Sequence, residues 1–313
     1  MLTYSVRRLL QILVVLFLAS IVIFAIVRMI PGDPALNLAG SDATEEQVQA
    51  IRHKMGLDKS LFAQYLIWVT QILHGDLGYS YLNGYPVSQL LGQRIPASAE
   101  LAFVAILVSI LLAFPLGILS AINAGGIIDL ICSAFSALSF AVPQFILLTF
   151  LILFFSVYIP LFPSGGRPSL SQFPIKHLLS LVLPALALSF SLAGMLMRYI
   201  RSSMLEVMTQ DYIRTAYAKG LSANIVIIKH ALRNSLISVV TIMALQLGSL
   251  FGKTIIVETI YAWPGIGRLV IQSINWRDYI TFQGVILFIV AVYLIANFTA
   301  DLLYGVLDPT IRY

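Results

Sequence analysis

Few residues of this chain have the types and the spacing that catalysis or cofactor binding requires. The sequence contains neither a Gly-x-Ser-x-Gly elbow nor a His-Glu-x-x-His helix. Its one cysteine, Cys132, lies in an apolar run, where a thiol is expected to pack rather than react. The four histidines are spread over three loops without the helical pairing that holds zinc: His53, His74, His177 and His230. We therefore expect no metal site and no enzymatic activity in this chain.

One stretch imitates a nucleotide-binding loop. Residues Gly248–Thr254 read Gly-Ser-Leu-Phe-Gly-Lys-Thr, one residue short of the phosphate-binding motif, which has four residues between its glycines. The stretch also lies in an apolar run with no soluble strand before it. We expect no ATP binding here, so the energy for any transport must come from another chain.

Charged residues beside the apolar runs restrict the mechanism. Asp129, Glu258 and Asp301 all fall near the ends of these runs, whereas coupling to protons or sodium requires carboxylates deep in the membrane. Lys253, near another boundary, has two open interpretations. Its ammonium either extends to the membrane interface or lies on a transport pathway, where it pairs with Glu258 or influences which substrates pass.

The elements that position these residues are apolar helices. Hydrophobic residues make up 59% of the chain and charged residues 11%, and the mean hydropathy is +0.92, which is typical of a membrane protein. A ~30 Å hydrocarbon core needs about 20 helical residues, and continuously apolar runs do not fit β-barrel strands. We predict an all-α fold with six transmembrane helices, at Leu9–Val27, Leu101–Asn123, Leu130–Tyr158, Leu178–Met197, Asn234–Gly252 and Tyr279–Ala300. The first run is longer than the apolar part of a signal peptide, so we expect it to be retained.

Lysine and arginine in the short connections predict the orientation of these spans. The segment between the fourth and fifth spans is strongly basic, because only Glu206 and Asp211 oppose Arg198, Arg201, Arg214, Lys219, Lys229 and Arg233. The positive-inside bias places this segment and both termini in the cytoplasm. It also explains the net charge of +5 without invoking nucleic acid.

The segment between the first two spans is too long to be a simple turn. With the first span it forms a first domain, residues 1–94, on the outer side of the membrane. We predict an amphipathic helix over Thr44–Lys54, with Thr44 as its N-cap. A second helix over Leu61–His74 carries Trp68, which suits the lipid interface.

A second domain, residues 95–306, contains the other five spans. Its segment 198–235 is too polar to insert into the membrane and too helix-prone to be irregular. Asp211 is the predicted N-cap of a short helix that runs to Lys219, and Gly220 ends that helix in a left-handed turn.

Ser222 or Asn224 is then predicted to begin a second short helix. Two helices around a glycine turn form a protrusion that fits a groove on a partner protein. A solvated basic loop is the alternative, and the residues alone do not separate the two.

At this segment the sequence resembles the permease subunits of bacterial ATP-binding-cassette (ABC) importers, in the branch that handles di- and oligopeptides, glutathione and nickel complexes. That superfamily has Glu-Ala-Ala, three residues, Gly, then nine residues and Ile-x-Leu-Pro, here aligned as Arg214-Thr215-Ala216, Gly220 and His230-Ala231-Leu232-Arg233. Arginine replaces the Glu and the last Pro of this pattern, and both replacements resemble the version of the motif in the peptide and nickel branch. Three further stretches resemble that branch, Ile30–Pro34, Gly75–Gly78 and Trp263–Arg268, so the resemblance covers nearly the whole chain.

The resemblance implies the type I ABC-importer transmembrane fold in the bacterial inner membrane, with this chain forming half of a translocation pathway. The implied partners are a second permease subunit, two ATPase subunits and an external substrate-binding protein. ATP and Mg²⁺ would be held by the ATPases, and no cofactor by this chain. The direction, import, rests on the resemblance alone, and peptide, glutathione and nickel complexes are not distinguished. The alternative function is a stand-alone secondary transporter or channel driven by an ion gradient.

The resemblance also assigns residues to surfaces. The residues expected to dock on the ATPase are Glu206, Asp211, Tyr212, Arg214, Ala216, Lys219 and Gly220, of which Ala216 and Gly220 permit close approach. The face expected to receive the binding protein comprises Gly75, Asp76, Trp263, Pro264, Gly265 and Arg268, although turns alone explain these residues equally well.

Several polar, kinked or flexible residues of the third to fifth spans are candidates for lining a pathway. They are Ser139, Pro143, Gln144, Met197 and Lys253. Ordinary packing explains most of them equally well.

Overall fold

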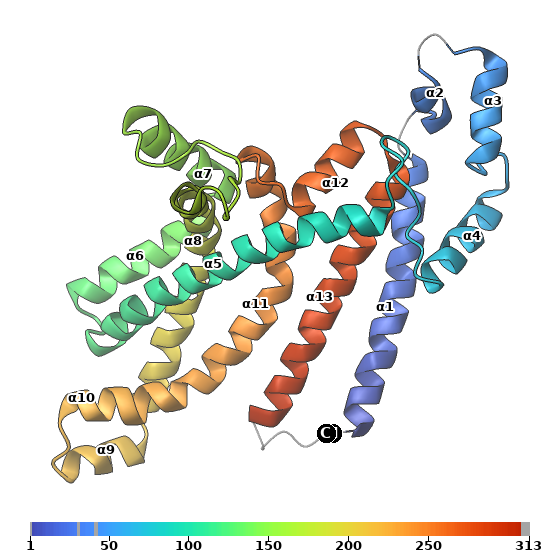
Figure 1. Cartoon of the computed structure of the whole chain (residues 1–313). Coiled ribbons are helices and arrows are strands. Elements are labelled where there is room, and N and C mark those ends of the chain that lie inside the picture. The colour runs from blue at the N-terminus through green and yellow to red at the C-terminus, as the bar shows by residue number, and fades with distance from the viewer. Residues whose placement is uncertain (1, 30–31, 41–42, 308–313) are drawn as a thin grey trace. The chain divides into compact units, whose positions relative to one another are not determined.

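A computed structural model describes residues 2–29, 32–40 and 43–307, and the regular structure in these ranges is helical apart from one isolated bridge between Tyr79 and Pro86 (Figure 1). The prediction of an all-α fold is confirmed. In chain order the elements are α1 (Leu2–Met29), α2 (Pro34–Ala39), α3 (Glu45–Lys54), α4 (Leu61–Leu73), α5 (Val87–Ile122), α6 (Ile127–Ala141), α7 (Gln144–Ile152), the π-helix η1 (Leu153–Tyr158), α8 (Pro174–Met208), α9 (Asp211–Ala218), α10 (Ala223–Ile225), the π-helix η2 (Val226–Leu232), α11 (Arg233–Ile260), α12 (Ile266–Asn275) and α13 (Tyr279–Leu307).

Long apolar helices match most of the predicted spans. Among the described residues, four helices have the length and hydropathy to cross a membrane, namely Val6–Met29 of α1, α5, α8 and Tyr279–Leu302 of α13. They correspond to the first, second, fourth and sixth predictions. The fifth falls in α11, which has 28 residues and is therefore ~42 Å long at 1.5 Å per residue, although several of its side chains lie outside the described part.

The third predicted span is not one straight helix. The axes of α6 and α7 differ by 100° across a short break, and η1 then replaces the regular helix. Pro143 supplies no N–H, and the residue before a proline avoids the helical region, so Val142 is extended with ψ of 115°. The break follows from the proline, but its sharpness was not predicted.

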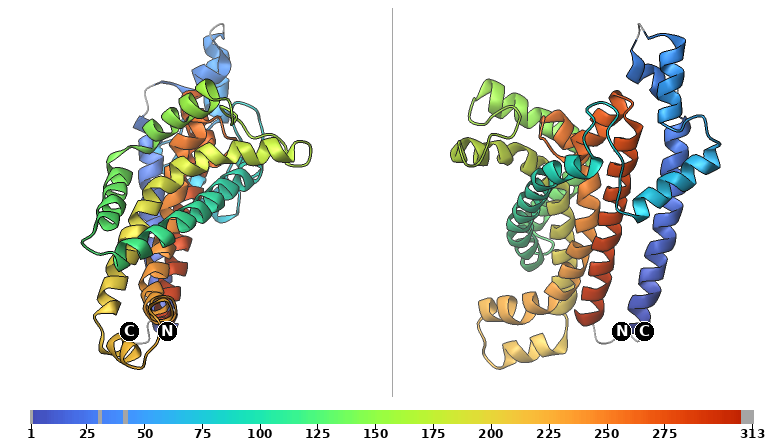
Figure 2. Two further views of the ribbon diagram at one scale, coloured as in Figure 1. Left: turned by 90° about the vertical axis from the view of Figure 1, so that its left-hand side faces the viewer. Right: turned by 45° about the vertical axis from the view of Figure 1, so that its right-hand side comes forward.

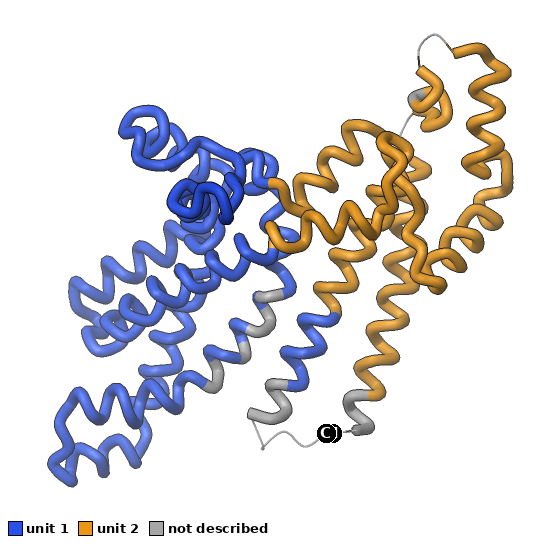
Figure 3. Tube along the Cα trace, viewed as in Figure 1, with its two compact units in different colours: residues 1, 99–263, 295–313 blue, residues 2–98, 264–294 orange. Residues whose placement is uncertain are grey.

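The chain divides into two compact units (Figure 3). Unit 1 contains Ala99–Trp263 and the end of α13 from Ile295, whereas unit 2 contains Leu2–Ser98 and Pro264–Leu294. The helices α5 and α13 each contribute to both units. Unit 2 therefore joins the N-terminal third of the chain to a segment far along the sequence.

In unit 1, α8 is the central helix and packs against α6, α7 and α11. Its contact with α6 is close because Gly194 has no side chain, and a Cβ there would collide with Ser139. Its contact with α5 depends on Gly117, where a Cβ would lie 2.8 Å from Cβ of Ile200. Small residues let apolar helices approach in this way.

In unit 2, the two predicted helices after the first span are confirmed. Thr44 Oγ1 accepts a hydrogen bond from Gln47 N at 3.4 Å, and Gln47 Oε1 accepts one from Thr44 N at 3.0 Å, so α3 begins with a capping box. The helix α4 begins after Ser60 and ends at Leu73, within one residue of the predicted range.

Trp68 was predicted to face the lipid interface, but it is buried. It is 7% exposed and packs with Tyr65 against Phe24 of α1, with the Trp68 and Phe24 ring centroids 6.0 Å apart. Burial of a large aromatic surface outweighs the preference of tryptophan for the lipid interface, and this cluster fixes α4 on α1.

An ion pair fixes α2 on α3. Asp33 is the N-cap of α2, accepts a hydrogen bond from Ala35 N at 2.9 Å, and pairs with Arg52 of α3. Burial alone would raise the pKa of Asp33, but the hydrogen bonds from Arg52 and Ala35 outweigh it and hold the pKa below its ordinary value of 3.8.

Buried Asp278 joins the two sequence segments of unit 2. Its carboxylate accepts hydrogen bonds from Ser80 Oγ, from Tyr81 N at 3.2 Å and from Thr281 Oγ1 at 2.7 Å. Nearby, a Cβ at Gly78 would lie 2.7 Å from Cγ2 of Ile280. The Gly75–Gly78 stretch and the start of α13 thus pack together.

Candidate functional site

The basic segment between α8 and α11 is ordered and protrudes from unit 1 as a hairpin of α9 and α10 (Figures 1 and 2). Helix α8 continues to Met208, so the first part of the predicted loop is helical. Helix α9 then begins at Asp211 with Gln210 as its N-cap, so the prediction of Asp211 as the cap is wrong by one residue. Asp211 remains in the first turn, where its charge complements the helix dipole.

Helix α9 has one buried and one exposed face. Ile213 and Ala216 are 2% and 6% exposed and join the core of unit 1 with Met204 of α8. Ala216 was predicted to permit close approach of the ATPase. It is instead buried and anchors α9 within its own chain. On the other face, the expected docking residues Asp211, Tyr212, Arg214 and Lys219 are exposed, and Glu206 is exposed near the end of α8.

Gly220 reverses the chain in the predicted left-handed turn, with φ of 78°. A Cβ at this position would meet nothing within 4 Å. The glycine is therefore required by the backbone conformation and not by a close contact within this chain. Ser222 is the N-cap of α10, as one of the two predicted alternatives.

The second arm of the hairpin continues into α11. Helix α10 passes directly into η2 and then into α11, so Ala223–Ile260 is one continuous but bent helical segment with a π-helical turn (Figures 1 and 2), not the separate short helix predicted. π-Turns of this kind are frequent at functional sites. Asn234 Nδ2 donates to Tyr212 OH at 2.8 Å, which ties α9 to the start of α11.

A buried ion pair holds α6 and α8 together close to the hairpin. Asp129 accepts hydrogen bonds from Arg201 Nε at 2.6 Å and Nη2 at 2.8 Å, from Ser120 Oγ at 2.5 Å and from Gly125 N at 2.9 Å. The sequence placed Asp129 near the end of an apolar run but indicated no partner for it. Arg201 was counted only as a basic loop residue, and no local pattern links two positions 72 residues apart.

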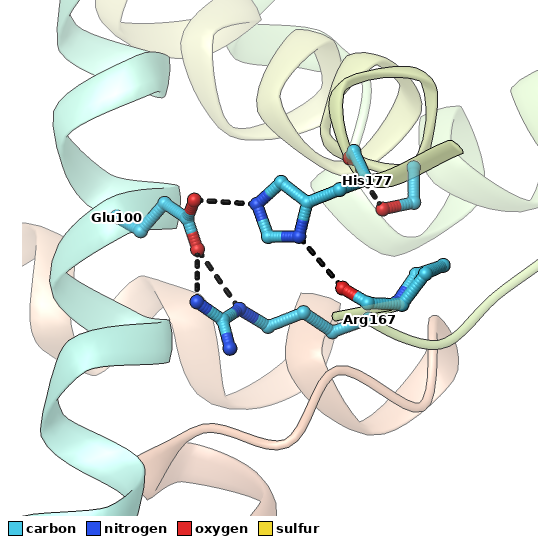
Figure 4. Close-up of polar contacts among 5 residues, drawn as sticks. Glu100, Arg167 and His177 are labelled. Atoms are coloured by element: carbon cyan, nitrogen blue, oxygen red, sulfur yellow. Dashed lines mark hydrogen bonds and ion pairs between the residues drawn. The ribbon is translucent and has the colours of Figure 1, made fainter. Parts of the chain in front are cut away.

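A second polar cluster joins Glu100, Arg167 and His177, whose side chains Figure 4 shows, and it lies beside the ring of Trp263. Glu100 of α5 accepts hydrogen bonds from Arg167 Nε at 2.8 Å and bonds His177 Nε2 of α8 at 2.6 Å. The other His177 nitrogen, Nδ1, lies 2.7 Å from the carbonyl oxygen of Pro168. Both ring nitrogens thus face oxygen atoms, and the Arg167 guanidinium lies 5.7 Å from the centre of the Trp263 ring.

This cluster fixes a strained turn. Ala262, just before Trp263, has φ of 53°, which is unfavourable for a residue with a Cβ. Trp263 is fully buried and Gly265 is buried, so neither residue offers a surface to a binding protein. Of that predicted face, Gly75 and Asp76 are exposed, and Pro264 and Arg268 are half-buried.

The predicted pathway residues separate into two groups. Ser139 and Met197 are 1% and 2% exposed and pack within unit 1. Gln144, directly after Pro143, donates from Nε2 to Ser191 Oγ of α8 at 3.0 Å. Lys253 is half-buried on α11.

Comparison with known proteins identifies the family. The model of the binding-protein-dependent transport system inner membrane component matches residues 113–313, and the N-terminal model of the same transport system membrane component matches residues 1–102. The chain belongs to this permease family. It is a transmembrane subunit of an ABC importer and a multi-pass protein of the inner membrane.

Relatives of similar length support this assignment. A probable peptide ABC transporter permease of Sinorhizobium fredii is 37% identical over 99% of both chains. A putative peptide transport system permease of Brucella abortus is 38% identical over 98% of both. The glutathione transport system permease GsiC of Shigella flexneri is 34% identical over 100% of both. No relative among these favours a stand-alone ion-driven transporter.

A solved structure confirms the fold. The inward-facing MetNI methionine ABC transporter aligns with a TM-score of 0.56 over 71% of this permease and 97% of that chain, at 20% identity. At this identity the likeness concerns the fold, which is that of a type I importer transmembrane domain.

Proposed function

We propose that this permease imports a small organic solute of the peptide or glutathione class, together with a second permease, two ATPases and an external binding protein. Full-length similarity to permeases named for peptide and glutathione transport supports the substrate class. ATP and Mg²⁺ are bound by the ATPases, and this chain carries the movement without catalysing a reaction.

The hairpin of α9 and α10 is the proposed docking element for an ATPase on the cytoplasmic side. One observation carries this proposal: Ile213 and Ala216 anchor α9 inside the chain while Asp211, Arg214 and Lys219 remain exposed. Because its buried face is packed in the core of unit 1, α9 transmits a displacement of its charged face to the helices that it contacts.

Movement of the hairpin reaches the membrane through rigid connections. Its first arm follows α8, and its second arm is continuous with α11, so rotation of an ATPase displaces both helices as a unit. Gln144 and Lys253 are the proposed pathway residues, because their side chains are polar and Lys253 is only half-buried. On the opposite side, Gly75 and Asp76 are the proposed contacts for the binding protein.

Co-purification tests the proposed assembly. The tagged chain is extracted gently from its native membrane, and the proteins retained with it are identified by mass spectrometry. We expect two ATPases and a second permease, and the associated binding protein then reveals the solute. Recovery of the chain alone in good yield would contradict the proposal.

Matched lysine variants locate the docking surface. Lys219→Ala is expected to reduce recovery of the ATPase, because the charge lies on the exposed end of the hairpin. Lys176→Ala is the control, since Lys176 is also exposed but lies at the other end of α8. Equal recovery in both variants would place docking elsewhere.

A further inference from the structure

Unit 2 contains a cavity of about 710 Å³ that the proposed docking and pathway residues of unit 1 do not line. Its lining comes from α1, α2, α3, the connection between α3 and α4, α4, the segment after α4 and the start of α13. Sites for small organic ligands have volumes of about 300–1,000 Å³. The cavity therefore has the size of a ligand site.

Unpaired polar atoms gather at this cavity. Among the described residues, four buried side-chain atoms have no hydrogen-bond partner: Arg28 Nε, Trp68 Nε1, Tyr279 OH and Gln283 Nε2. All four residues line the cavity, and Trp68, Tyr279 and Gln283 are each more than nine-tenths buried. Because proteins pair nearly all buried polar groups, four unpaired atoms at one cavity point to a missing partner.

The chemistry of these atoms selects that partner. The three nitrogens are hydrogen-bond donors and not acceptors, and the tyrosine hydroxyl also donates. A ligand that satisfies them must present several acceptor oxygens. Arg28 is held in place because its Nη2 donates to Gln64 Oε1 at 2.7 Å.

Charge and apolar surface define the ligand further. Arg28, Lys54 and Lys59 line the cavity, and Asp76 is the one carboxylate among the described lining residues, so the cavity favours an anion. The rings of Phe24 and Trp68 supply apolar surface beside the donors.

We propose that this cavity binds a small organic carboxylate, whose oxygens accept hydrogen bonds from Arg28, Trp68, Tyr279 and Gln283 while its apolar part packs on the aromatic rings. The proposal rests on unit 2 alone and is independent of ATPase docking and of the solute transported.

A pair of probes that differ in charge tests the proposal. The full chain in phosphatidylcholine nanodiscs is titrated with 3-phenylpropanoate and with the neutral 3-phenylpropanamide, and tryptophan fluorescence and heat of binding are recorded. We expect saturable binding of the carboxylate and at least about tenfold weaker binding of the amide, because hydrogen bonds to an ionised acceptor are about twice as strong. Trp68→Phe should abolish the fluorescence change, although Trp263 and Trp276 remain.

Variants of the unpaired donors provide the second test. Gln283→Leu and Tyr279→Phe each remove an atom that lacks a partner, so neither should destabilise the ligand-free chain. Together they should weaken carboxylate binding by about tenfold or more, whereas the exposed control Gln89→Leu should bind normally. The absence of saturable binding would mean that the cavity holds only water, and equal binding of the two probes or normal binding by the double variant would also overturn the proposal.

Discussion

The ion pair between Asp129 and Arg201 predicts a large effect of one substitution. Arg201→Ala removes two charge-assisted hydrogen bonds from a carboxylate that is 7% exposed. Removing one partner of a buried ion pair costs about 3–5 kcal/mol. The Arg201 side chain is 32% exposed, so water compensates for part of the loss, and we expect a destabilisation of about 2–3 kcal/mol.

The chain carries its own reporter for this measurement. Cys132, its one cysteine, is buried on α6 about one turn after Asp129. A thiol-reactive fluorophore added during heating in detergent therefore detects the opening of α6. At about 2.1 cal/mol/K of unfolding entropy per residue, a loss of about 2–3 kcal/mol corresponds to a decrease in Tm of about 3–5 °C for a chain of 313 residues.

Two further variants identify the cause. Arg201→Lys keeps the charge but loses the two-pronged geometry, so its Tm should lie between those of wild type and Arg201→Ala. Arg214→Ala removes an arginine that is 84% exposed and should leave the Tm unchanged. If the Tm of Arg201→Ala equals that of Arg214→Ala, the buried pair does not stabilise the contact between α6 and α8, and the reasoning fails.

Substitutions at three other positions have defined outcomes. Gly220→Asn should retain more uptake than Gly220→Val in a transport assay, because asparagine tolerates the left-handed conformation and a β-branched residue does not. Glu100→Gln should lower the thermal midpoint and shift the Trp263 emission to longer wavelength, since the carboxylate that joins Arg167 to His177 is lost. The lowered pKa of Asp33 means that its ionised form stabilises α2 on α3 above pH 3.8 and that this contribution is lost as the pH falls through the folded value. The protection factors of the α3 amides, which correct hydrogen exchange for its intrinsic pH dependence, should fall on acidification in the wild type, and Asp33→Asn should remove that fall.

Local sequence signals predicted local structure well. Thr44 with Glu45 indicated the start of α3, and the capping box formed there. Gly220 indicated a left-handed turn, and its φ is 78°. Each of these features depends on residues within a few positions of one another, which is the range over which capping and turn chemistry act.

Features that depend on distant residues were missed. Glu100 and His177 are 77 positions apart and meet only because α5 and α8 pack together. The spacing of the histidines argued against metal binding by His177 but did not indicate its carboxylate partner. Residue type also did not reveal the direction of side chains, so Trp68, Ala216 and Trp263 were assigned to surfaces although they are buried. The apolar faces of α4 and α9 are a local pattern that indicates the burial of Trp68 and Ala216. No local pattern indicates the burial of Trp263, which depends on tertiary contacts.

Site-specific cross-linking tests the proposed coupling most directly. In a Cys132→Ala background, a cysteine at Lys219 on the hairpin is compared with a cysteine at Leu82, which is exposed in unit 2. Membranes containing the assembled transporter are treated with a short thiol cross-linker with and without ATP. We predict a cross-link from position 219 to the ATPase that changes in yield when ATP binds, and none from position 82. A cross-link from neither position, or an equal one from both, would contradict docking of the ATPase on the hairpin of α9 and α10.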